Sequence, residues 1–152
     1  MNGLGQRVAE GIWKKLLRYP RRISKRVLIA DDDSVIRSLL TAAVTSEGYT
    51  AVTVSDGRAA FKILQSDADF TAALFEMSMP GLNGTDLIHH MRTEKRLRRI
   101  PVMLITAEQD LKVMSDCFAA GAVAFLNKPL TAEKMRAALG LLLRSAEVRI
   151  AA

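Results

Sequence analysis

From residue 26 onward, short apolar runs alternate with longer segments of helical periodicity, and this alternation restricts the fold more than any other feature. The runs are four to six residues long, as in strands buried on both faces of a sheet. The segments between them repeat apolar residues three and four apart, which predicts helices. Because parallel strands are linked through helices, we predict an α/β fold with a doubly wound, five-stranded parallel sheet and helices on both faces. The predicted strands are 27–30, 49–54, 70–75, 100–105 and 123–126.

Polar residues predict where several helices begin. Ser34, Ser55 and Thr131 each precede a helical apolar pattern, and their hydroxyl groups can cap a helix by accepting hydrogen bonds from free backbone N–H groups. A further helix is predicted over 85–95, and the last helix is predicted to end at about residue 143.

The composition is that of one ordinary globular domain, with 152 residues of which 49% are hydrophobic and 25% charged. The lone Cys117 cannot form an intramolecular disulfide. No apolar run approaches the roughly 18 residues of a membrane span, and the N-terminus does not have the pattern of a signal peptide. We therefore expect a cytoplasmic protein.

The formal charge of +6 is concentrated at the N-terminus. Residues 1–26 hold eight bases and one acid, whereas the rest of the chain is close to neutral. Pro20 must interrupt any preceding helix. The sequence thus predicts a basic N-terminal arm, 1–25, and a globular domain, 26–152, and any electrostatic partner should bind the arm.

An apolar stripe within the arm predicts that the arm forms a helix and binds another surface. Leu4, Val8, Ile12 and Leu16 recur every four residues, so 4–19 are expected to form an amphipathic helix. Exchange or docking between two chains would bury the stripe, and we expect a homodimer formed through the arm. Packing against its own domain and contact with an anionic membrane surface are the alternatives. Nucleic acid binding is not expected, because it would leave the stripe unexplained.

Charged and hydroxyl side chains follow the predicted strands, and the carboxyl ends of parallel strands share one edge of a sheet. We expect three or four carboxylates, a hydroxyl and an ammonium to converge there. Clustered carboxylates favour Mg²⁺, a lysine can pair with a phosphoryl oxygen or a carboxylate, and a threonine can donate to the same oxygen. A solvated turn would explain the acids alone, but not the lysine and threonine beside them. The residues concerned are Asp31, Asp32, Asp33, Glu76, Thr106 and Lys128.

The sequence around these residues resembles the response-regulator receiver family, whose members are CheY-like domains. The resemblance extends from residue 26 to about residue 146 and implies a flavodoxin-like sheet of strand order 2-1-3-4-5. It rests on four segments in the family's order: VLIADDDSVIR at 27–37, MPGLNG at 79–84, Thr106-Ala107-Glu108 and Lys128-Pro129.

The resemblance also implies roles for individual residues. Asp31, Asp32 and the backbone carbonyl of Ser78 would hold a weakly bound Mg²⁺ ion. Thr106 and Phe125 would be the switch residues, Lys128 would contact a phosphoryl group, and the bond before Pro129 would be cis.

One position departs from the family pattern. Glu76 stands where the family places its phosphoacceptor aspartate, three residues before the Met-Pro pair. It could be a working acceptor, although the added methylene disturbs the in-line geometry of phosphoryl transfer. It could instead mark an inactive scaffold, or imitate the phosphorylated state in part, since it carries less charge than a phosphate.

The sequence therefore predicts an atypical single-domain response regulator of a two-component or phosphorelay system. We expect a phosphorylation-independent interaction module and not an enzyme, with a sensor histidine kinase or a downstream signalling protein as partner. The alternative is a Mg²⁺-dependent phosphohydrolase of the haloacid dehalogenase type, whose Asp-x-Asp motif Asp31 and Asp33 would match. Such enzymes have a second acid pair and usually a cap domain, and the sequence shows neither.

Overall fold

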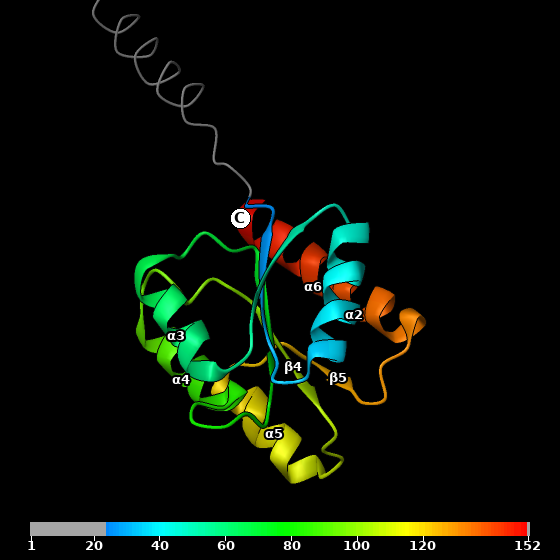
Figure 1. The fold of residues 1–152 in the computed structure, drawn as a ribbon. Coiled ribbons are helices and arrows are strands. Elements are labelled where there is room, and N and C mark those ends of the chain that lie inside the picture. Colours follow the sequence, from blue (N-terminus) through cyan, green and yellow to red (C-terminus); the bar gives the residue numbers. More distant parts are fainter. Residues whose placement is uncertain (1–23, 152) are drawn as a thin grey trace, which may run out of the picture.

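The computed structural model describes residues 24–151, which form a five-stranded parallel sheet flanked by helices (Figure 1). The strand order is β2-β1-β3-β4-β5, so the predicted doubly wound sheet and its 2-1-3-4-5 order are confirmed. The strands are β1 (Arg26–Ala30), β2 (Thr50–Val54), β3 (Ala72–Glu76), β4 (Val102–Thr106) and β5 (Ala124–Asn127). The helices are α2 (Ser34–Ser46), α3 (Gly57–Ser66), α4 (Gly84–Thr93), α5 (Leu111–Ala120) and α6 (Ala132–Ala151).

Two apolar cores lie on opposite faces of the sheet. Because successive strand side chains point to opposite faces, Leu28 and Phe75 enter one core while Ile29 and Leu74 enter the other. Helices α3, α4 and α5 cover the first face, and α2 and α6 cover the second (Figure 1). The central strands β3 and β4 are buried along their whole length, which explains their continuous apolar sequence.

Several predicted boundaries need correction. The caps of α2 and α3 are Asp33 and Asp56, not Ser34 and Ser55. Each cap aspartate is adjacent to the predicted serine, Asp33 one residue before Ser34 and Asp56 one residue after Ser55, and its carboxylate accepts backbone N–H bonds of the first turn. At the last helix, the Thr131 hydroxyl accepts from Lys134 N at 3.2 Å.

The remaining boundary differences are small apart from one. Helix α4 spans Gly84–Thr93 where 85–95 was predicted. Helix α6 continues to Ala151, well past the predicted end at residue 143, because no glycine or proline interrupts the chain after Gly140. No helix among residues 24–151 is both long enough and apolar enough to cross a bilayer.

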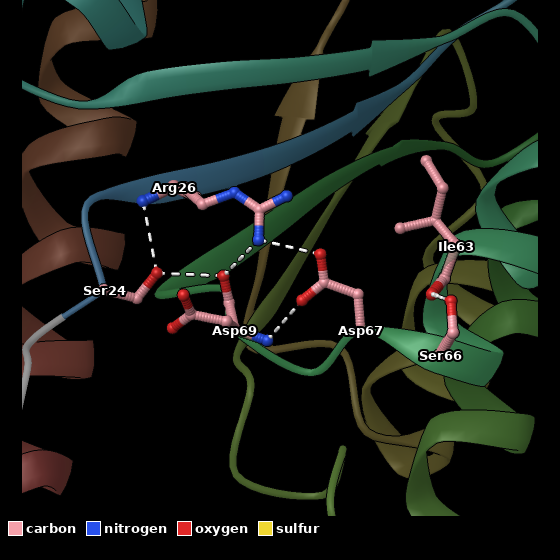
Figure 2. A network of polar contacts seen from close by, with 6 residues as sticks. All are labelled: Ser24, Arg26, Ile63, Ser66, Asp67 and Asp69. Atoms are coloured by element: carbon pink, nitrogen blue, oxygen red, sulfur yellow. Dashed lines mark hydrogen bonds and ion pairs between the residues drawn. The ribbon is translucent and has the colours of Figure 1, made fainter.

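A polar network holds residues 24–26, at the start of β1, against the turn before β3 (Figure 2). Ser24 Oγ donates to the Asp69 carbonyl at 3.0 Å, and one guanidinium nitrogen of Arg26 pairs with Asp67 Oδ2 at 2.8 Å. The Asp67 side chain also accepts from Asp69 N, which holds the turn before β3 in place. Residues 24–26 are therefore attached firmly to the amino edge of the sheet. The predicted arm–domain boundary at 25/26 lies inside this network, whereas residues 1–23 fall outside the described part of the chain.

Candidate functional site

Asp31 lies directly after β1 and is completely buried. Its Oδ1 atom accepts from Asp33 N at 2.8 Å, whereas Oδ2 is buried and has no hydrogen-bond partner among the described residues. Burial raises the pKa of Asp31 to about 6, and the charge of Glu76 acts in the same direction, against the Asp33 N–H bond and the charge of Lys128. Asp31 is thus a buried carboxyl next to that of Glu76, with one oxygen that receives no hydrogen bond from the described residues.

Glu76 is the last residue of β3, the central strand of the sheet, and only 5% of its surface is exposed. Its Oε2 atom lies 2.7 Å from the ammonium nitrogen of Lys128. Partial burial lowers the pKa of Lys128, but the hydrogen bond and charge of Glu76, together with Asp31 and Asp33, outweigh this effect and raise it. The pair therefore consists of a buried carboxylate held by a fully charged ammonium.

Backbone geometry brings Lys128 to Glu76. Lys128 follows β5, and its backbone N–H donates to the Thr106 carbonyl at 2.9 Å. The bond between Lys128 and Pro129 is cis. Because β3 pairs with β4 and β4 with β5, the ends of these strands lie side by side, and the lysine side chain crosses the end of β4 to reach Glu76.

The two predicted switch residues, Thr106 and Phe125, lie in the paired strands β4 and β5. Thr106 ends β4 and is buried, and its Oγ1 atom accepts from Glu108 N at 2.8 Å. Phe125 in β5 is half-buried, with its ring edge-to-face against Phe118 at a centroid distance of 4.8 Å. The structure thus places a buried hydroxyl at the end of β4 and a half-buried ring in the neighbouring β5.

Comparison with known proteins assigns the family. The family model of the response regulator receiver domain matches residues 27–140. The chain belongs to this family. Receivers are the signalling domains of two-component systems, and this receiver has its Asp31, Glu76 and Lys128 side chains at the carboxyl edge of the sheet.

Individual relatives agree with this assignment. The chemotaxis protein CheY of Pseudomonas aeruginosa is 30% identical over 112 residues, covering 73% of this chain and 90% of that protein. The sensory/regulatory protein RpfC of Xanthomonas campestris pv. campestris is 30% identical over 122 residues, covering 78% of this chain but 17% of RpfC. The structure of the chemotaxis response regulator CheY4 of Vibrio cholerae has a TM-score of 0.72 at 26% identity, covering 78% of this chain and 98% of that one.

Fewer acidic side chains meet at the site in this receiver than the sequence predicts. Asp32 is exposed, and Asp33 uses its carboxylate to cap α2. Among residues 24–151, no three carboxylate, histidine or cysteine side chains form a group that could hold a metal ion. The free Asp31 Oδ2 atom nevertheless suits a hard cation, so a Mg²⁺ ion here would need Asp32, a backbone carbonyl such as that of Ser78, and several waters.

Two residues that shape the site were not singled out from the sequence. Arg37 donates from its guanidinium to the Asp31 carbonyl at 2.7 Å and so holds the backbone of that residue. Gly84 begins α4 so close to β3 that an added Cβ would lie 2.7 Å from the Glu76 carbonyl oxygen. Both lie within the segments that resemble the family, but only the folded chain shows what they touch.

Proposed function

We propose that this receiver is a phosphorylation-independent interaction module, in which Glu76 replaces the phosphoacceptor aspartate. The observation that supports this most directly is the 2.7 Å ion pair between Glu76 and Lys128. In the proposal, the lysine that would contact a phosphoryl oxygen already holds a carboxylate oxygen in the unmodified protein.

Phosphorylation of Glu76 is disfavoured for two reasons. One of its two carboxylate oxygens is engaged by Lys128, and attack on a phosphodonor through that oxygen would require the buried pair to break. The extra methylene also displaces the carboxylate from the in-line position that an aspartate would take. Imitation of the phosphorylated state would be partial, since a carboxylate carries one negative charge and an acyl phosphate carries about two.

Weak Mg²⁺ binding is part of the proposal. Asp31, Asp32 and the Ser78 carbonyl would hold the ion, and the unpartnered Asp31 Oδ2 atom supports this. A bound ion would offset the repulsion between the acids at this edge.

The proposed partners are a sensor histidine kinase or a downstream signalling protein in the cytoplasm. We also propose that the chain forms a homodimer through residues 1–25 and binds no nucleic acid, with membrane contact the less favoured use of the arm. Light scattering of the full chain and of a chain lacking residues 1–20 tests the dimer.

A catalytic role is not part of the proposal. In a phosphohydrolase of the haloacid dehalogenase type, Asp33 would serve the reaction, but here its carboxylate accepts from Val35 N and Ile36 N as the cap of α2. Incubation with a generic phosphate ester checks this directly, and we expect no phosphate release above the uncatalysed rate.

The test of the proposal is intact-mass spectrometry after treatment with acetyl phosphate and Mg²⁺. We expect no phosphate adduct on the wild-type chain. The matched control is Glu76→Asp, which restores the shorter carboxylate beside Asp31 and Lys128 and should accept a phosphoryl group. An adduct on wild-type Glu76 would overturn phosphorylation independence, and a folded Glu76→Asp chain without an adduct would show that the pocket no longer supports transfer.

A further inference from the structure

We propose that an exposed apolar strip on α2 is the docking surface for the N-terminal arm of a second copy of this chain. The α2 strip consists of Val35, Leu39 and Ala42. The inference rests on the homodimer proposed above and adds the surface that the arm binds, so that each copy receives the arm of the other.

The α2 strip is apolar where α2 faces away from the sheet. Its residues are spaced four and three apart and therefore share one face of the helix. Val35 is 65% exposed and Leu39 is 40% exposed, while Leu40 and Val44 on the other face are buried in the core. Contiguous exposed apolar side chains, unlike single ones, mark interaction surfaces.

The α2 strip continues into a groove between α2 and α6. The groove has a volume of about 270 Å³ and is lined mainly by small and apolar side chains. Side chains of a helix that docks on the strip could insert into this groove. Its lining residues are Leu39, Ala42, Ala43, Ser46, Glu47, Ala132, Met135 and Arg136.

The charges around the α2 strip complement those of the arm. Asp32 and Asp33 are exposed at the end near the carboxyl edge of the sheet, whereas Glu47 at the other end lies beside Arg136 and Arg144. Residues 1–26 carry eight bases and one acid. A basic amphipathic arm thus finds complementary charge at the Asp32–Asp33 end of the apolar surface, which favours docking in one orientation.

The apolar stripe of the arm and the proposed surface on α2 are also similar in length. The apolar stripe of the arm extends from Leu4 to Leu16, which spans about 18 Å in a helix at 1.5 Å per residue. The distance along α2 from Val35 to the cap residue Glu47 covers the same number of residues and again about 18 Å. One helix of this length can therefore cover the α2 strip and the groove.

The attachment of the arm favours a second copy over the arm's own domain. The network of Ser24, Arg26, Asp67 and Asp69 fixes the chain at the amino edge, where β1 begins (Figure 2). To reach its own α2 strip, the arm would have to reverse direction within residues 20–23. Only these four residues, Pro-Arg-Arg-Ile, separate the expected arm helix from the fixed Ser24, which leaves little chain for such a reversal.

Exchange between two copies needs no such reversal. In an exchanged pair, the arm that precedes the fixed Ser24 of one copy docks on the α2 strip of the other. Two copies that exchange arms satisfy both stripes at once and close into a two-fold dimer, leaving no open end for further assembly.

The experiment uses Leu39→Glu in the full chain, with Leu111→Glu as the matched control. Leu111 is an equally apolar and more exposed residue on α5, outside the proposed surface. Light scattering at tens of micromolar should give twice the chain mass of 16.7 kDa for the wild type and the control, and the mass of one chain for Leu39→Glu. Val35→Glu serves as a second variant, because Val35 is exposed and its replacement should not disturb the core.

A mixing experiment separates exchange from docking within one chain. A chain lacking residues 1–20 keeps an intact α2 strip, and the Leu39→Glu chain keeps an intact arm, so each alone should be a monomer. Their mixture should form a heterodimer through one arm and one strip. Monomeric variants that do not combine would overturn the exchange.

Other outcomes separate this inference from the proposed homodimer. If the full chain is a dimer that the deletion dissociates but Leu39→Glu and Val35→Glu do not, the homodimer stands and the α2 strip is the wrong surface. If the wild-type chain is monomeric, both the homodimer and the docking surface are wrong, and sedimentation with anionic vesicles then tests the arm as a membrane contact.

Discussion

Replacing Asp31 by asparagine should stabilise this receiver when no divalent cation is bound. Asp31 is completely buried, and its pKa is raised from 3.8 to about 6 by burial and by the charge of Glu76. At neutral pH the folded state must therefore hold a carboxylate that would be better solvated in the unfolded chain. Asparagine keeps the oxygen that accepts from Asp33 N and removes the charge.

The raised pKa sets the magnitude and the pH range. A shift of this size corresponds to at most about 3 kcal/mol at neutral pH. Solvent at the open edge of the sheet screens part of it, so we expect Asp31→Asn to gain about 1 to 2 kcal/mol in the free energy of unfolding. For an acid with a raised folded pKa, the cost is fully present above about pH 6 and disappears as the pH falls below the unfolded value near 4. The gain should shrink over that interval.

Urea unfolding in EDTA at several pH values between 4 and 8 measures this effect. Asp32→Asn is the control, because it removes the same charge from an exposed neighbour and should change the stability by less than about 0.5 kcal/mol. A less stable Asp31→Asn chain at neutral pH, or a gain that does not decrease toward pH 4, would refute the reasoning. Millimolar Mg²⁺ should reduce the difference, because only the wild-type carboxylate offers the ion a charged ligand.

Three further predictions concern the same edge of the sheet and the start of the chain. Lys128→Met should lower the free energy of unfolding by about 2 to 3 kcal/mol, because it leaves the buried Glu76 carboxylate without its ion pair; denaturant unfolding measures this, and an unchanged midpoint would contradict it. Gly84→Ala should cost about 1 to 3 kcal/mol, since the new methyl group would press against the Glu76 carbonyl and Leu104; Ser78→Ala in the neighbouring loop is the control. Arg26→Ala should cost about 1 kcal/mol, because the ion pair with Asp67 is partly exposed, and should increase hydrogen exchange at the start of β1.

The sequence alone determined the architecture of this receiver. The alternation of apolar runs and helical segments predicts each strand to within about two residues, because strands buried on both faces tolerate few polar side chains. The parallel arrangement also places the strand ends together, so Glu76 and Lys128 could be assigned to one edge before their contact was known. The helix caps were less predictable, since Asp33 and Ser34 are equally suited to the cap position and local geometry selects between them.

Only the tertiary structure decided how the charges are used. The sequence offers three consecutive aspartates, but burial singles out Asp31, exposure leaves Asp32 in solvent, and the start of α2 engages Asp33. The partner of Lys128 and the free oxygen of Asp31 depend on distances between strands that are far apart in the chain. The same holds for the α2 strip, since a helical apolar pattern does not distinguish the face that packs on the sheet from apolar residues that remain outside. Residue types and spacing set the fold through local periodicity, whereas burial and pairing arise only when distant segments meet.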